Sequence, residues 1–226
     1  MKFGVVTFPG SNCDQDLIYS FRKNLGQEVV ELWHKDRDLQ GCDFICLPGG
    51  FSYGDYLRSG AIARFSPIMN EVIAHAKKGG YVLGICNGFQ ILTESGLLEG
   101  ALIRNKSMHF VCKNVHLRRG TADSLLTRNL DPKKPYEVPI AHAEGNFFCD
   151  ENTLNEIEEE DRVLFYYCDE TGKMNDAANP NGSLNNIAGI TNRERNIFGM
   201  MPHPERASDN ILGNLDGKAI LESVLG

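Results

Sequence analysis

The first half of the chain alternates between short apolar runs and longer segments with a helical repeat of apolar residues. The runs have the length of buried strands, and the longer segments keep their apolar residues on one face, as helices do. The expected strands are 2–8, 28–33, 44–50 and 81–86, and the expected helices are 13–26, 61–78 and 88–96. This alternation predicts a parallel sheet covered by helices on both faces.

The second half of the chain is less regular. Alternating or apolar runs predict strands, the first two of them antiparallel, and a helix is expected between the two pairs of strands and again at the end of the sequence. The expected strands are 109–119, 136–141, 186–192 and 196–206, the helices are 152–160 and 216–225, and 169–186 is a loop or long hairpin. No linker or repeat interrupts the pattern, so we expect a single domain over 1–226, with an α/β fold and a mostly parallel sheet to which antiparallel strands are added.

Composition excludes several classes of protein. The 226 residues are 42% hydrophobic, enough for one large α/β domain, and the net charge is −7 with both signs scattered along the chain. No basic run indicates nucleic acid, and no apolar run has the length of a membrane span. We therefore expect neither a nucleic-acid nor a membrane partner.

The seven cysteines indicate a reducing compartment. Their number is odd, they contain no CxxC pair, and several lie inside apolar runs. We expect neither a disulfide framework nor a metal site. The sequence enters a strand pattern at its second residue, which predicts no signal peptide and a cytoplasmic location.

Cys86 stands at the end of a predicted strand and the start of a predicted helix. Gly84 and Gly88 flank it in the pattern Gly-x-Cys-x-Gly, the form of a nucleophile elbow with sulfur in place of oxygen. The helix start favours the thiolate, and the amide of Asn87 points to where an oxyanion would form. A tight turn around a packed thiol would give the same pattern, so the elbow alone leaves both interpretations open.

A base for this thiol is expected at the end of a later strand. His203 follows the run "IFGMM" directly, Pro202 and Pro204 fix its backbone, and Glu205 can hold one ring nitrogen. Gly49 and Gly50 end a neighbouring strand, where their backbone can approach a substrate closely. Because carboxyl ends of parallel strands share one edge of the sheet, these groups are expected to meet there.

The motifs together resemble those of the class I, or triad, glutamine amidotransferases. They are "LPGG" at 47–50, "GICNGFQIL" at 84–92 and "MPHPE" at 201–205. Further stretches, "PGGFSYGDYLRSGAIAR" at 48–64 and "AHAEGNF" at 141–147, are similar to the family of glutaminase subunits of phosphoribosylformylglycinamidine synthase. Ser59 is a small departure, since cysteine or alanine is expected there.

The resemblance implies a flavodoxin-like sheet and a glutaminase mechanism. Cys86 would attack the side-chain amide of glutamine, with His203 as base and Glu205 orienting it. Glutamine would bind to Gly49, Gly50, Asn87 and Gln90, with Gly50 and Asn87 lining the oxyanion hole. The segment 105–110, including Ser107, His109 and Phe110, would hold the α-amino and α-carboxylate groups.

The resemblance also implies partners. A large synthetase subunit would bind ATP, magnesium and formylglycinamide ribonucleotide, convert the latter to the formylglycinamidine in the fourth step of purine synthesis, and work with a very small third subunit. A chain of this length has no room for the synthetase, so no cofactor is expected on it. The loop 51–60, with aromatic and charged residues, is a candidate docking surface.

Three alternatives remain at this level. A stand-alone redox or chaperone protein also carries an elbow cysteine, but it would lack the His-Pro-Glu segment. A decayed glutaminase acting as a scaffold would have lost the nucleophile or base, whereas Cys86, His203 and Glu205 are all present. A glutaminase serving another nucleotide pathway is disfavoured by "CNGFQ" and "AHAEGNF".

Overall fold

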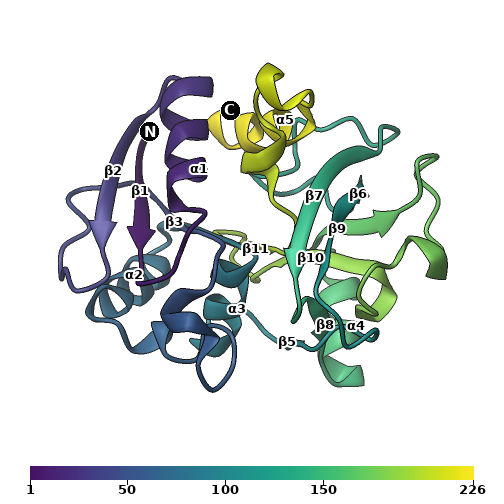
Figure 1. Cartoon of the computed structure of the whole chain (residues 1–226), viewed down its shortest axis with the longest axis horizontal. Helices are drawn as coiled ribbons and strands as arrows, with labels where there is room; N and C mark the ends of the chain where they lie inside the picture. Colours follow the sequence, from purple (N-terminus) through teal and green to yellow (C-terminus); the bar gives the residue numbers. More distant parts are fainter.

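A nine-stranded mixed sheet runs through the molecule in the computed structural model, which describes residues 1–226 (Figure 1). Its strand order is β2-β1-β3-β4-β11-β10-β9-β6-β7, and β5 and β8 form a separate antiparallel pair. The strands are β1 Lys2–Thr7, β2 Glu28–Trp33, β3 Phe44–Leu47, β4 Tyr81–Ile85, β5 Ala101–Ile103, β6 Val111–Arg119, β7 Tyr136–His142, β8 Asn146–Phe148, β9 Val163–Cys168, β10 Ile187–Thr191 and β11 Ile197–Met200.

Five α-helices accompany the sheet. They are α1 Asp14–Tyr19, α2 Pro67–Lys77, α3 Asn87–Glu94, α4 Glu151–Glu159 and α5 Asp216–Glu222. In Figure 1, α1 and α5 lie together at the top, and α2 and α3 lie at the bottom. None of these helices combines the length and the apolarity that a membrane crossing requires.

The parallel half of the sheet has the order β2-β1-β3-β4-β11, which is the flavodoxin-like order. The central strands β3 and β11 are buried throughout, because helices cover both faces of a parallel sheet. In the register, Met200 pairs with Ile85, so β4 and β11 end at the same level. The residues that follow them, Cys86 and 201–203, therefore emerge at one edge of the sheet.

The antiparallel half extends from β11 through β10, β9, β6 and β7. Its outermost pair joins Val111 to His142, so β7 ends beside the start of β6. The predicted fold class, a flavodoxin-like α/β sheet with added antiparallel strands, is confirmed, with parallel and antiparallel pairings equal in number in the sheet. The strands β5, β8 and β9 were not assigned from the sequence.

Two helices depart from the predicted bounds. The helix expected over 61–78 begins at Pro67, because Ser66 is held in an extended conformation before the proline ring, and only a short 3-10 turn, Ala63–Phe65, precedes it. The helix expected over 13–26 is α-helical to Tyr19 and continues as a π-helix over Ser20–Asn24.

Candidate active site

Cys86 occupies a strained turn between β4 and α3. Its backbone has φ 51° and ψ −107°, a conformation that residues other than glycine rarely adopt. Cys86 is also the N-cap residue of α3. A Cβ on Gly88 would lie 1.9 Å from the carbonyl oxygen of Leu47, and one on Gly84 would lie 2.6 Å from the carbonyl group of Gly88. Both flanking glycines are therefore required by packing, as a nucleophile elbow demands.

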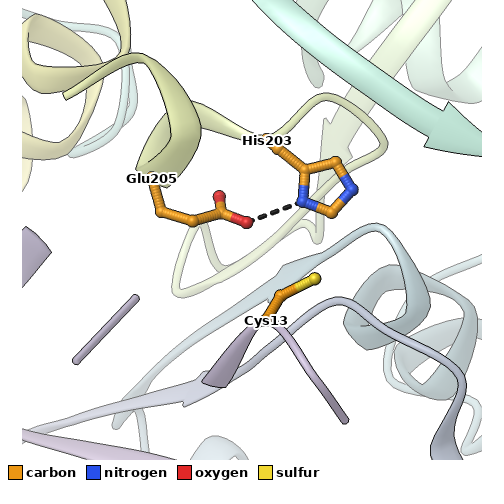
Figure 2. Close-up of side chains that lie close together, drawn as sticks. All are labelled: Cys13, His203 and Glu205. Carbon is orange, nitrogen blue, oxygen red and sulfur yellow. Dashed lines mark hydrogen bonds and ion pairs between the residues drawn. The ribbon is translucent and has the colours of Figure 1, made fainter. Parts of the chain in front are cut away.

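His203 follows β11 and is held from two sides. Its Nδ1 lies 2.6 Å from Oε1 of Glu205, and its backbone amide donates to the carbonyl oxygen of Pro139 on β7 at 2.8 Å (Figure 2). Both side chains of the pair are almost completely buried. Burial alone lowers the pKa of His203, but the negative charges of Glu205 and Cys86 outweigh it and raise the pKa well above its usual value.

Gly49 brings the thiol and the imidazole together. A Cβ on Gly49 would lie 2.6 Å from Cε1 of His203 and 3.3 Å from Cβ of Cys86, so both side chains pack against its Cα. On the other side, Cys86 Sγ lies 3.8 Å from the carbonyl oxygen of Ala141 at the end of β7. The Cys86 thiol is thus enclosed by the ends of β3, β7 and β11.

A pocket of about 230 Å³ opens beside the thiol. Of the predicted residues it is lined by Gly50, Cys86 and Gln90. The volume is below the roughly 300–1,000 Å³ of pockets for drug-sized ligands and suits a small substrate. Nucleophile, glycine loop and first helical turn therefore share one small cavity.

Hydrogen bonds of its side chain hold Asn87 in position at the start of α3. Its Oδ1 accepts hydrogen bonds from the backbone amide and hydroxyl of Ser52, and its Nδ2 donates to Asp55 Oδ1 at 3.2 Å and to Gln90 Oε1 at 2.9 Å. Gln90 Nε2 in turn donates to the carbonyl oxygen of Glu144 at 2.6 Å. The side chain of Asn87 ties the loop after β3 to the first turn of α3.

The segment 105–110, which was predicted to hold the α-amino and α-carboxylate groups of glutamine, lies beside the pocket and does not line it. Ser107, His109 and Phe110 are exposed and do not line the pocket. The segment approaches the pocket through Phe110, whose ring stacks on that of Phe51 with centroids 6.3 Å apart, and Phe51 lines the pocket.

Cys13, which was not singled out in the sequence, lies beneath the His203–Glu205 pair (Figure 2). Its sulfur accepts a hydrogen bond from Arg206 Nη2 at 3.0 Å. One ligand atom from each of Cys13, His203 and Glu205 lies within 4.8 Å of the others, so these side chains could hold a metal ion.

The charged residues of the pocket wall were also missed. They are Asp55, Arg104 and Glu144, and the neutral Ser59 and His142 accompany them. They come from three separate segments of the chain, and none has a spacing that indicates chemistry by itself. Asp55 and Glu144 could have been found because "FSYGDYLRSG" and "AHAEGNF" are motifs whose acidic side chains have no role in the expected triad, whereas no sequence signal indicates Arg104.

Comparisons with known proteins show the family of the chain. Residues 1–220 match the family model of the CobB/CobQ-like glutamine amidotransferase domain. The chain is 55% identical over 226 residues to phosphoribosylformylglycinamidine synthase subunit PurQ of Koribacter versatilis, covering 100% of this chain and 98% of the relative.

Two solved structures show the fold. A chain of the PurLQS structure from Thermotoga maritima is 40% identical with a TM-score of 0.87, covering 99% of this chain and 97% of that one. A putative GMP synthase subunit from Thermoplasma acidophilum, 15% identical with a TM-score of 0.58 over 100% of this chain and 93% of that one, shares the fold alone. With its match to the family model over residues 1–220 and its 55% identity over the full chain, the protein belongs to the PurQ family of glutamine amidotransferases.

Proposed function

We propose that this chain is the glutaminase subunit of a phosphoribosylformylglycinamidine synthase. Cys86 attacks the side-chain carboxamide of glutamine, ammonia leaves, and a γ-glutamyl thioester remains on the sulfur. Water then hydrolyses the thioester to glutamate and frees the thiol. The observation that carries this proposal is the His203–Glu205 pair placed beside a cysteine at the N-cap of α3.

The hydrogen bond to Glu205 determines which ring nitrogen of His203 can exchange a proton with the Cys86 thiol. Because Glu205 Oε1 accepts from Nδ1 of His203, that nitrogen carries a proton and Nε2 is left for exchange with the thiol. Nε2 is buried and has no hydrogen-bond partner within the chain. The raised pKa of His203 favours an imidazolium, which can protonate the departing nitrogen.

The developing oxyanion is assigned to backbone amides. Asn87 is the first residue of α3, where amide groups lack intrahelical partners and the helix dipole is positive. Gly50 lines the same pocket with φ 126°, and an added Cβ would lie 2.6 Å from the backbone nitrogen of Asn12. This supports Gly50 and Asn87 as oxyanion donors and glycine as the residue needed at 50.

The ammonia is used by a partner in this proposal. A large synthetase subunit binds ATP, magnesium and formylglycinamide ribonucleotide, and a very small third subunit completes the complex in the cytoplasm. The related chain belongs to a structure named PurLQS, which supports an assembly of this kind. The loop 51–60 beside the pocket exposes Tyr56 and Leu57, at 70% and 82%, which supports it as part of the docking surface.

Reconstitution with the large and small subunits tests the division of labour. Cys86→Ala should abolish synthesis from glutamine and preserve synthesis from ammonium at high pH, where more of it is free NH₃. Cys112→Ala, which removes an exposed thiol outside the pocket, should preserve both activities. Loss of both activities in Cys86→Ala, with subunit binding intact, would overturn the proposal.

A glutaminase for another nucleotide pathway is the second candidate. The likeness to the putative GMP synthase protein favours it only at the level of the fold, because the two chains are 15% identical. Supplying the synthetase subunits of both pathways separately distinguishes the candidates, since glutamine-dependent synthesis is expected only with the formylglycinamide ribonucleotide enzyme.

A further inference from the structure

The turn that bears Glu205 is anchored at both of its ends. It is a short 3-10 helix, Pro204–Ala207, and the Arg206 amide donates to the carbonyl oxygen of His203 at 3.2 Å. The His203 end is tied to β7 by the bond from its amide to the carbonyl oxygen of Pro139. The Glu205 end is tied to the helical segment after β1, through side chains that lie outside the active-site pocket.

Two serine hydroxyls meet at the backbone carbonyl oxygen of Glu205. Ser208 Oγ lies 2.9 Å and Ser20 Oγ lies 3.2 Å from this oxygen, and the two hydroxyls are 2.8 Å apart. Ser20 and Ser208 are 1% and 2% exposed, and Glu205 is 3% exposed. Because the cluster is screened from water, these bonds fix the backbone of Glu205.

Ser208 is the central member of this cluster. Asn24 Nδ2 donates to Ser208 Oγ at 3.1 Å and to the Ser208 carbonyl oxygen at 2.9 Å. A hydroxyl has one proton to donate, and since Asn24 supplies the proton of its own bond, the proton of Ser208 is free for the Glu205 carbonyl oxygen. Ser208 is therefore the direct donor to Glu205, and Ser20 and Asn24 hold it in place.

The partners of Ser208 come from an unusual turn of helix. Ser20–Asn24 is a π-helix that continues α1, with a hydrogen bond from the Leu25 amide to the Ser20 carbonyl oxygen at 3.1 Å. Such turns are rare and are frequently found at functional sites. Here the first and last residues of the π-turn, Ser20 and Asn24, both contact Ser208. The π-turn thus presents polar groups to the segment that carries Glu205.

Other contacts fix the rest of the Pro204–Ala207 turn. Arg206 Nε donates to Asp16 Oδ2 on α1 at 3.1 Å. Gly217 of α5 lies so close to the carbonyl oxygen of Pro204 that no Cβ would fit there. The turn therefore packs against both α1 and α5, which lie together at the top of Figure 1.

The carboxylate of Glu205 has no second anchor of its own. Its Oε1 lies 2.6 Å from Nδ1 of His203, whereas its Oε2 has no hydrogen-bond partner within the chain. No other side chain therefore aims the carboxylate at the ring, and its direction is set from its own backbone. A hydrogen bond weakens steeply when its angle departs from the ideal, so a displaced backbone would weaken the hold on the imidazole.

We propose that Ser208 and Ser20 are positioning residues of the triad, which fix the carbonyl group of Glu205 to the π-turn and so aim its carboxylate at the imidazole. The inference rests on the proposed function, in which that carboxylate orients His203. Neither serine lines the pocket beside Cys86, so both act through Glu205.

Steady-state kinetics of the reconstituted complex test this assignment. Ser208→Ala should lower kcat for glutamine by about 10- to 100-fold and change KM little, since a displacement of about 1 Å can cost about 10²-fold in rate. Ser20→Ala, which removes the longer bond, should have a smaller effect of the same kind. Ser223→Ala is the matched control, because it removes a similarly buried hydroxyl, bonded to the Asn129 amide, and should leave both constants unchanged.

A double-mutant cycle separates positioning from packing. If Ser208 acts through the carboxylate of Glu205, Ser208→Ala should cost no further rate in a Glu205→Ala complex. A general loosening of the fold would instead multiply the two losses. Multiplied losses, or a wild-type kcat in the Ser208→Ala complex, would overturn the inference.

The Nδ1 proton of His203 gives a readout that does not depend on activity. Its NMR resonance in the full chain should lie downfield because of the bond to Glu205, and it should move upfield in Ser208→Ala but not in Ser223→Ala. If it does so while the wild-type complex releases no glutamate from glutamine, the proposed function fails and the positioning assignment stands. If the resonance stays in place and Ser208→Ala releases glutamate at the wild-type rate, the function stands and the assignment fails.

Discussion

No side chain fits between Gly49 and the imidazole of His203. The ring lies where a Cβ of residue 49 would be, and Cys86 packs against the same Cα. The proposed triad of Cys86, His203 and Glu205 therefore requires a residue without a Cβ at position 49, directly after β3.

Gly49→Ala should displace His203 and slow glutamine hydrolysis. Moving a catalytic group by about 1 Å can cost roughly 10²-fold in rate, and overpacking costs about 1–3 kcal/mol of unfolding free energy. Glutaminase assays and thermal unfolding measure the two effects. Gly96→Ala, at φ +69° with open space around it, is the control that strains a backbone away from the site; equal rates in both variants would contradict the packing argument.

Cys86 should be the thiol that a glutamine-like diazoketone labels. Cys13 also lies beside His203, but it does not line the pocket, so shape should exclude the reagent from it. Peptide mapping of the labelled complex reads out the site. Cys13→Ser should label as wild type does and Cys86→Ala should not label; a label found on Cys13 would show that proximity to the imidazole, and not the pocket, confers reactivity.

Glu205→Gln should retain the fold and reduce kcat, by up to about 10⁴-fold as for a carboxylate-to-amide change in a comparable triad. The carboxylate charge raises the pKa of His203, so its removal should also shift the basic form of the ring to lower pH. Rates of the full complex across pH measure both effects. An unchanged rate and profile would mean that Glu205 only packs against the ring.

Asn105→Asp should destabilise the pocket wall. The Nδ2 group donates to two carbonyl oxygens, at 2.9 Å and 2.8 Å, and a carboxylate there would leave both acceptors without a partner. Each buried unsatisfied group costs about 1–3 kcal/mol, so thermal unfolding should shift downward clearly. Asn129→Asp, at an exposed position, is the control, and equal shifts would show that the network around Asn105 is not fixed.

Strands β1, β3 and β4 were predictable because each is a buried apolar run followed by a helical pattern. Together with the later apolar run at 197–201, this pattern predicts that Gly49, Cys86 and His203 meet at one edge of the sheet. The three-residue strands β5 and β8 were missed, since three residues carry no periodicity. The start of α2 was predicted too early, at residue 61, because the helical repeat of apolar residues extends ahead of Pro67. The proline makes residue 67 the first of the helix.

The pocket wall was less predictable than the triad. Asp55, Arg104 and Glu144 lie on turns and loops, where neither apolar periodicity nor motif spacing assigns a direction to a side chain. Cys13 was missed because its neighbours His203 and Arg206 come from the far end of the sequence. Such contacts follow from strand order, which a local pattern does not specify.

The position of β11 has a consequence for how the enzyme is assembled during folding. This strand lies between β4 and β10 in the middle of the sheet, although nearly all of the chain precedes it. A newly made chain can form the Cys86 turn early, but it gains the imidazole only when a late strand is inserted between two others. Pairing across such a long separation is slow relative to local folding, so we expect the Cys86 turn to form before His203 is brought beside it.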